Sequence, residues 1–169
     1  MPPSLLLFLL FILFLISATS VSGQQQRTPE ETLAEIQALT HFRLSLRDPL
    51  GALAGWDAAS PSAPCSWRGV VCSPSPGAGV TPRVVELRLP RLRLAGPVPD
   101  SLSALPQLRK LSLRSNSLNG TIPTSLSRLR HLRALFLQNN YLSGALPPGF
   151  PTNLTELQVL NLAGNRLSG

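Results

Sequence analysis

The sequence predicts an α/β solenoid, in which short parallel strands stack into a right-handed open coil behind a helical N-terminal cap. Three observations predict this fold. A block of about two dozen residues recurs from Val84 onward, a stretch with helical periodicity precedes it, and two cysteines lie between the two regions. Proline makes up 17 of the 169 residues. This excludes a long helical bundle, because each interior proline removes a helix hydrogen bond.

The first 23 residues have the form of a secretory signal peptide. Residues 5–16 are an unbroken apolar run, shorter than the ~20 residues that cross a bilayer, and small residues follow it directly. We expect cleavage after Gly23, with Ala18 and Ser20 as alternative sites. An uncleaved anchor is the other interpretation. The remaining chain divides into a cap, residues 24–83, and about four repeats, residues 84–169, the last of them incomplete.

A helix is predicted at the start of the cap. Thr28 can cap it, Pro29 suits its first position, and Glu31 completes a capping box. Apolar residues then recur every three or four positions and predict a buried stripe. The members of this stripe are Leu33, Ile36, Leu39, Phe42 and Leu46. The segment 48–51 should end the helix.

The two cysteines are predicted to form a disulfide. Cys65 and Cys72 have six residues between them, and in a secreted chain an isolated pair this close is far more often a bridge than two free thiols. His41 and His131 are distant from them in sequence. We therefore expect no metal and no cofactor.

From Val84 the chain repeats itself at spacings of 24, 24 and 25 residues. Each copy follows or closely varies the pattern L-x-x-L-x-L, followed in the later copies by an asparagine and a leucine, which is the leucine-rich repeat signature. In L-x-L, the leucines point to one side of a short strand and the residue between them to the other. Stacked copies should therefore bury the leucines in a parallel sheet and leave a 3-10 or irregular convex side. We expect Asn116, Asn140 and Asn165 to turn inward and satisfy backbone groups.

The solvent side of the strands is the usual binding surface of a solenoid. Here it carries cations on the first two repeats and aromatic residues on the third. The candidate ligand-binding residues on this concave face are Arg88, Arg91, Lys110, Ser112, Arg114, Phe136, Gln138, Tyr141 and Asn161. One interpretation is capture of an acidic group, such as a peptide carboxylate or a cell-wall polyanion. The other interpretation, which is commoner for charge runs, is a solvated surface on which the aliphatic parts of the Lys and Arg side chains cover apolar surface of the protein.

Catalysis and nucleic-acid binding have little support. The sequence contains no Ser/His/Asp set, phosphate-binding loop or metal-ligand cluster, so we expect no catalytic residue. The net charge of +7 is also typical of nucleic-acid binding, but a secretory signal removes the chain from that compartment. Asn119 and Asn153 begin N-glycosylation sequons, and both are predicted to lie off the concave face.

The cap and the repeats together resemble the amino-terminal ectodomain of plant leucine-rich-repeat receptor-like serine/threonine kinases. The segment 46–50, Trp56 and the run from Cys65 to Cys72 are similar to the plant N-terminal cap. The half-repeat Gly-Thr-Ile-Pro at 120–123 is similar to the plant-specific repeat class. The resemblance covers about residues 30–169. It implies a cell-surface glycoprotein at the plasma membrane that recognises an extracellular peptide, a hormone or a co-receptor ectodomain.

The printed sequence stops at Gly169, within a repeat. The expectation from the resemblance is therefore a receptor segment, with kinase activity and membrane association supplied by a region C-terminal to it. The alternative is a free-standing protein secreted to the apoplast, such as an inhibitor of a cell-wall-degrading enzyme or a co-receptor-like adaptor. An extracellular hydrolase is a further alternative, disfavoured by the missing catalytic set.

Overall fold

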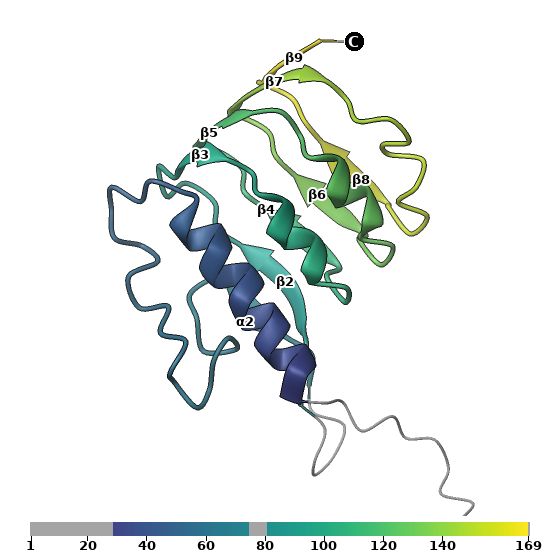
Figure 1. Ribbon diagram of the computed structural model, residues 1–169. Helices are drawn as coiled ribbons and strands as arrows, with labels where there is room; N and C mark the ends of the chain where they lie inside the picture. The colour runs from purple at the N-terminus through teal and green to yellow at the C-terminus, as the bar shows by residue number, and fades with distance from the viewer. Residues whose placement is uncertain (1–28, 75–80, 169) are drawn as a thin grey trace, which may run out of the picture.

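In the computed structural model, which describes residues 29–74 and 81–168, the chain winds into stacked turns behind one flanking helix (Figure 1). Helix α2 spans Pro29–Leu44, which confirms the predicted helix, although it ends earlier than expected. Instead of extending to residue 48, the chain leaves the helix and Arg47 forms an antiparallel bridge with Ala95. The predicted signal peptide, residues 1–23, and the capping residue Thr28 lie outside the described residues.

Within the described ranges, the strands form two sheets that run along the coil. The first sheet has the order β1-β2-β4-β6-β8, and its strands are β1 Val70–Cys72, β2 Val84–Arg88, β4 Lys110–Ser112, β6 Ala134–Phe136 and β8 Val159–Asn161. Its pairings are parallel, except for the antiparallel contact of β1 with β2. This arrangement confirms the predicted column of parallel strands.

The second sheet was not predicted from the sequence. It has the order β3-β5-β7-β9 and contains β3 Ala95–Pro97, β5 Ser117–Gly120, β7 Tyr141–Ala145 and β9 Arg166–Ser168. The convex side carries 3-10 helices, η1 Asp100–Ala104 and η2 Thr124–Arg128, as expected from the repeat signature. Helix α2 packs beside η1, and η1 beside η2 (Figure 1).

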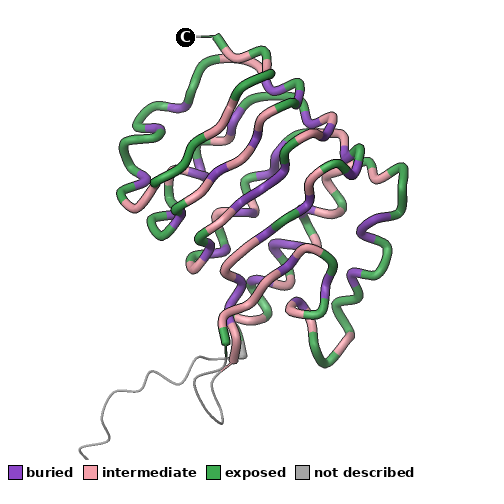
Figure 2. The backbone as a smooth tube through the Cα atoms, turned by 180° about the vertical axis from the view of Figure 1, so that it is seen from behind, coloured by how far each residue is buried: buried purple, intermediate pink, exposed green. Residues whose placement is uncertain are grey.

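The leucines of the strands form the core. Parallel register aligns Leu87 with Leu111, Leu111 with Leu135, and Leu135 with Leu160. The first three are fully buried, and burial of one leucine side chain contributes about 1.5–3 kcal/mol. Figure 2 shows the strands lying side by side, with buried positions within them and exposed positions on the connecting turns.

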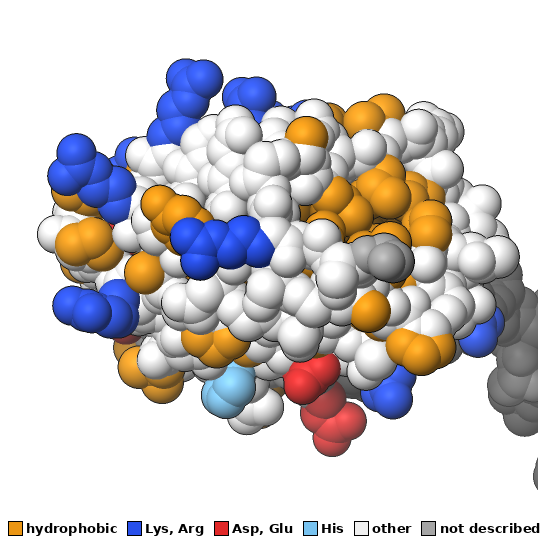
Figure 3. Space-filling model, turned by 90° about the horizontal axis from the view of Figure 1, so that it is seen from above, with side chains coloured by type: hydrophobic (Ala, Val, Ile, Leu, Met, Phe, Trp, Pro, Cys, Tyr) orange, Lys and Arg blue, Asp and Glu red, His pale blue; other side chains and the backbone are white. Residues whose placement is uncertain are grey.

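The last rung of the core is partly open. Leu160 is 37% exposed, whereas the equivalent leucines of earlier strands are covered by a neighbouring turn. Figure 3 shows hydrophobic side chains gathered in a patch on one side of the upper surface, away from most of the Lys and Arg side chains in that view. No helix in the described ranges is long and apolar enough to span a membrane.

The repeat asparagines turn inward, as predicted. Asn116 Oδ1 accepts hydrogen bonds from the backbone N–H groups of Leu92 and Leu94, at 2.9 and 3.1 Å. Its Nδ2 donates to the carbonyls of Leu89 and Leu113, at 2.8 and 2.9 Å. Asn140 and Asn165 make similar inter-turn contacts one and two turns later. The asparagine ladder thus pairs backbone groups that the stacking would otherwise bury unsatisfied.

The cap is held by a disulfide and an aromatic stack. Cys65 and Cys72 are joined, which confirms the predicted bridge. The rings of Trp56 and Trp67 stack with centroids 5.1 Å apart. Each indole N–H also donates to a backbone carbonyl: Trp56 Nε1 to Arg68 at 3.2 Å, and Trp67 Nε1 to Asp57 at 3.1 Å.

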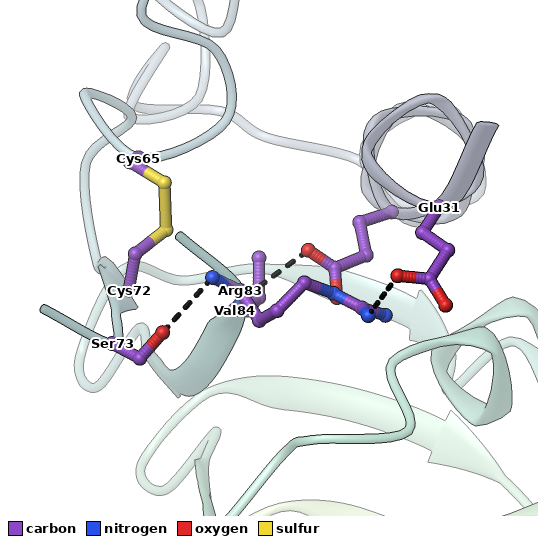
Figure 4. Close-up of polar contacts among 7 residues, drawn as sticks. Glu31, Cys65, Cys72, Ser73, Arg83 and Val84 are labelled. Atoms are coloured by element: carbon purple, nitrogen blue, oxygen red, sulfur yellow. Dashed lines mark hydrogen bonds and ion pairs between the residues drawn. A yellow bond between two sulfur atoms is a disulfide. The ribbon is translucent and has the colours of Figure 1, made fainter. Parts of the chain in front are cut away.

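A buried ion-pair cluster joins α2 to β2 (Figure 4). Arg83 Nε donates to Glu35 Oε1 and Arg83 Nη1 donates to Glu31 Oε2, both at 2.7 Å. Glu35 Oε2 also accepts the backbone N–H of Val84 at 3.1 Å. Arg83 is 5% exposed and Glu35 is fully buried. The cap helix is therefore tied to the first repeat by charge-assisted hydrogen bonds as well as by apolar packing.

This cluster corrects the predicted stripe of α2. Leu39 and Phe42 are fully buried as expected, but Leu33, expected on the same stripe, is 53% exposed. Glu35 occupies a buried position that apolar periodicity could not predict, because its carboxylate is neutralised by Arg83 from a segment 48 residues away.

We predict that Asn116→Leu destabilises the protein more than Asn165→Leu. The first change removes the hydrogen bonds of three buried backbone groups, the N–H groups of Leu92 and Leu94 and the carbonyl of Leu89, and an unsatisfied buried group costs about 1–3 kcal/mol. Asn165 is only half-buried, so water can replace part of its contacts. Urea unfolding of both variants measures the difference in the free energy of unfolding. Equal losses of stability in the two variants would contradict a stabilising role for the buried amide.

We also predict that Arg83→Leu lowers the free energy of unfolding by about 3–5 kcal/mol, because it leaves the Glu35 carboxylate buried without its partner. Arg133→Leu is the matched control. Arg133 pairs with Glu156 at 3.0 Å on the exposed surface, so its loss should change stability much less. Chemical denaturation followed by tryptophan fluorescence compares the two, and similar losses would argue against the buried cluster.

Candidate functional site

The outward positions of the first sheet form two aligned columns. Register places Glu86, Lys110, Ala134 and Val159 in one column, and Arg88, Ser112, Phe136 and Asn161 in the next. Since the leucines between them point into the core, these side chains lie on the opposite, outward face of the sheet, although Ser112 is covered by its neighbours and only 6% exposed. We call this set of positions, on β2, β4, β6 and β8, the concave-sheet surface.

A hollow of about 220 Å³ lies on this surface. Its lining consists of Arg88, Pro90, Lys110, Ser112, Arg114 and Phe136. The structure thus brings together five of the candidate residues named from the sequence, and adds Pro90. Sequence reasoning could have found Pro90, because it follows Arg88 by two positions just as Arg114 follows Ser112. We call this feature the cationic hollow.

The cations of the hollow differ in whether a carboxylate neutralises them. Arg88 Nε donates a hydrogen bond to a Glu86 carboxylate oxygen, and this bond raises the pKa of Arg88 above its ordinary value against a small opposing effect of burial. Lys110 Nζ lies 5.7 Å from the centroid of the Phe136 ring, a cation–π contact. Within the part of the chain that the structure describes, neither Lys110 nor Arg114 is paired with a carboxylate. The hollow therefore presents unneutralised positive charge beside an aromatic ring.

Three other candidate residues lie outside the lining of the hollow. Arg91 adopts a positive φ of 59° in the turn after β2, and Ser115, Asn139 and Gly164 adopt the same conformation one, two and three repeats later. Gln138 follows β6, with its Oε1 buried and unpaired among the described residues. Asn161 aligns with Phe136 on β8.

Tyr141 does not belong to the concave-sheet surface, so its placement there from the sequence is wrong. It begins β7 in the second sheet, and Arg166 lies over its ring at 4.9 Å from the centroid. The cause is the inward-turning Asn140, after which the chain leaves the first sheet and starts the second.

The glycosylation sequons lie outside the concave-sheet surface. Asn119 is exposed in β5 of the second sheet. Asn153 is exposed in the connection between β7 and β8, where it lines a polar hollow of about 890 Å³ together with Ser127, Arg128, Arg130, Thr152 and Thr155. Glycans at either position would leave the cationic hollow open.

A separate cluster of titratable groups, away from the cationic hollow, links two repeats. The two carboxylate oxygens of Glu156 are hydrogen-bonded to His131 Nδ1 at 2.7 Å and to Arg133 Nε at 3.0 Å. The hydrogen bonds with His131 and Arg133, in that order, lower the pKa of Glu156, so this exposed carboxylate stays ionised and links the third repeat to the fourth. In the described residues, no group of three or more His, Cys, Asp or Glu side chains could hold a metal ion.

Comparison with known families identifies both parts of the chain. The family described as Leucine rich repeat N-terminal domain matches residues 33–73, and the family described as Leucine rich repeat matches residues 82–142. The first match contains the disulfide and the tryptophan stack. The second contains β2 to β6 and the whole cationic hollow.

Individual relatives are plant receptor proteins. A probable inactive leucine-rich repeat receptor kinase, XIAO of Oryza sativa subsp. japonica, is 65% identical over 136 residues, which are 80% of this chain and 11% of the relative. The chain therefore spans about a tenth of the length of that relative.

Solved structures show the same fold. The crystal structure of the BIR3–SERK2 complex from Arabidopsis thaliana matches with a TM-score of 0.58 and 31% identity, over 80% of this chain and 84% of that chain. The Arabidopsis receptor kinase HAESA, in complex with the peptide hormone IDA and the co-receptor SERK1, matches with a TM-score of 0.68 and 33% identity, over 83% of this chain and 22% of that chain.

Proposed function

Because the chain belongs to the leucine-rich-repeat family and matches the N-terminal ectodomain of plant leucine-rich-repeat receptor kinases, we propose that it is an extracellular recognition module. In this proposal it forms the membrane-distal part of a cell-surface receptor. It binds an extracellular peptide, a hormone or a co-receptor ectodomain through the concave-sheet surface. Any kinase activity would belong to a region C-terminal to the residues given.

The observation that carries the proposal is the cationic hollow. Lys110 and Arg114 lie on an outward surface without carboxylate partners in the described chain, beside the half-buried ring of Phe136. Cations without carboxylate partners add self-repulsion to the folded state, and a bound anionic group would relieve it. A related receptor kinase, HAESA, is found in complex with a peptide hormone and a co-receptor, which supports ligands of this kind.

We predict that the chain is secreted and glycosylated when it is made in plant cells. The secreted product should lack residues 1–23, and Asn119→Gln and Asn153→Gln should each remove one glycan, as measured by intact-mass analysis before and after endoglycosidase treatment. An unglycosylated product that keeps its amino terminus inside the cell would contradict the extracellular assignment. A secreted but unglycosylated product would contradict only the sequons.

We further predict that partners bind through the concave-sheet surface. The secreted chain is immobilised and tested against a panel of plant receptor ectodomains and secreted peptides by surface plasmon resonance. For a genuine partner, Lys110→Glu should weaken binding by about tenfold or more, the effect of losing one charged contact. Arg109→Glu is the matched control, because Arg109 is exposed and adjacent in sequence but does not line the hollow. Equal effects of both changes on every partner would reject the concave-sheet surface as the binding face.

A further inference from the structure

Resting on the proposed function, which places the chain in the secretory pathway, we infer that the N-glycan on Asn153 packs its first sugars into the polar hollow beside η2. The polar hollow is the space of about 890 Å³ between η2 and the connection from β7 to β8. Because its walls come from two successive turns of the coil, a glycan seated there joins these turns to each other. The glycan is then a structural part of the convex side and not a chain that extends into solvent.

The attachment point of the glycan lies in the wall of the polar hollow and is held in place. Asn153 is one of the lining residues, and its backbone N–H donates to the carbonyl of Gly149 at 2.8 Å. The next residue, Leu154, is 3% exposed and donates its N–H to the carbonyl of Pro151 at 2.8 Å. The side-chain amide lies against Gly149, since a Cβ at residue 149 would come within 2.6 Å of Asn153 Nδ2. A sugar on this nitrogen therefore starts inside the hollow, from a fixed position.

The walls of the polar hollow suit a carbohydrate. Besides Asn153, they consist of hydroxyl and guanidinium side chains, from Ser127, Arg128, Arg130, Thr152 and Thr155. Arg128 and Arg130 are exposed, and neither guanidinium is bonded to a side chain or carbonyl in the part of the chain that the structure describes. Their N–H groups can donate to the hydroxyl and N-acetyl oxygens of a sugar. No apolar side chain is in the lining, so the hollow offers little contact to an apolar partner.

The polar hollow lies where the convex row of helices is interrupted. Helix α2 packs beside η1, and η1 beside η2, but between β7 and β8 the described chain forms turns and no 3-10 helix. This connection has the spacing of 25 rather than 24 residues, and it contains three prolines, each without a backbone N–H. They are Pro147, Pro148 and Pro151. Sugars in the hollow would cover the side of η2 that faces away from η1.

Covalent attachment favours the chain's own glycan over a free saccharide. A short tether presents the sugar to the walls at an effective concentration of about millimolar or more, whereas a free saccharide loses its translational freedom on binding. The volume of about 890 Å³ falls in the upper part of the ~300–1,000 Å³ range of sites that hold a small-molecule ligand. The second sequon provides a contrast, because Asn119 is exposed in β5 and does not line this hollow.

The first test measures whether the glycan covers the two arginines. The secreted, glycosylated chain and its Asn153→Gln variant are treated with phenylglyoxal, which modifies accessible guanidinium groups, and each site is followed by peptide mass spectrometry. Arg128 and Arg130 should react at least threefold more slowly in the chain that carries the Asn153 glycan. Arg109 is the matched control, because it is exposed but does not line the polar hollow. It should react at the same rate in both forms.

The second test measures whether the seated glycan stabilises the two turns. Asn153→Gln should lower the midpoint of thermal unfolding by about 2–4 °C, the shift of a modest loss of stability in a domain of about 150 residues. Thr155→Ala removes the same glycan and should lower the midpoint equally, whereas Thr155→Ser keeps the sequon and should not. Asn119→Gln removes the other glycan and should leave the midpoint unchanged. Calorimetry of each secreted variant gives these midpoints.

A double-mutant cycle links the stabilisation to the walls. In a chain with Arg128→Gln and Arg130→Gln, loss of the Asn153 glycan should change the unfolding midpoint by less than half of its effect in the unaltered chain, because the contacts are already removed. A full effect in this background would mean that the glycan stabilises the chain without touching the arginines, which overturns the inference.

The remaining outcomes separate this inference from the proposed function. Equal phenylglyoxal rates with and without the glycan would show that it projects into solvent, and protection of the arginines of the glycosylated chain by an added oligogalacturonate would show that the hollow is open to a free saccharide. Either result overturns the inference. If the secreted chain carries a glycan at Asn119 but none at Asn153, the inference fails and the proposed function stands. If the product stays inside the cell without glycans, both fail.

Discussion

The constraint on which the structure depends is that no repeat can bury its own core. A turn of about 24 residues contributes only a thin layer, so its leucines are covered only when a neighbouring turn lies against them. Close stacking in turn buries backbone groups between turns. The asparagine ladder satisfies those groups: the single amide of Asn116 bonds to the N–H groups of Leu92 and Leu94 and to the carbonyl of Leu89, all in the preceding turn. The leucine spacing and the asparagine spacing therefore depend on each other: the leucines require close stacking of the turns, and the asparagines pair the backbone groups that this stacking buries.

The same constraint makes a cap necessary at the first turn, where no earlier repeat exists. Helix α2 covers that end, and Leu39 and Phe42 are buried there. Apolar packing alone does not set its position. The Arg83 side chain reaches both Glu31 and Glu35, and Glu35 also accepts the N–H of Val84 as β2 begins. A buried charge pair of this kind fixes the register of helix against strand, because any displacement leaves an uncompensated charge.

How far the sequence predicts this molecule depends on whether a feature is local or repeated. Strands, the asparagine ladder and the disulfide follow from spacing, and five residues of the cationic hollow follow from alternation along the strands. The second sheet and the position of Tyr141 do not, because alternation does not reveal where the chain turns after Asn140. The exposure of Leu33 and the burial of Glu35 also escape prediction. The burial of Glu35 depends on Arg83, which is remote in sequence and has no periodic signal.

Along each strand, the inward residues contribute to stability and the outward residues are available for recognition. In a strand such as β4, Leu111 points inward and packs between the neighbouring turns, while Lys110 points outward and takes no part in the leucine core. Parallel register then places outward residues of adjacent turns side by side, so that Lys110 meets Phe136 from the following strand. A binding site can therefore be assembled from residues that are far apart in sequence, without altering the core. Because each turn repeats the same geometry, the chemistry of the site is set by the few outward side chains that break the repeat.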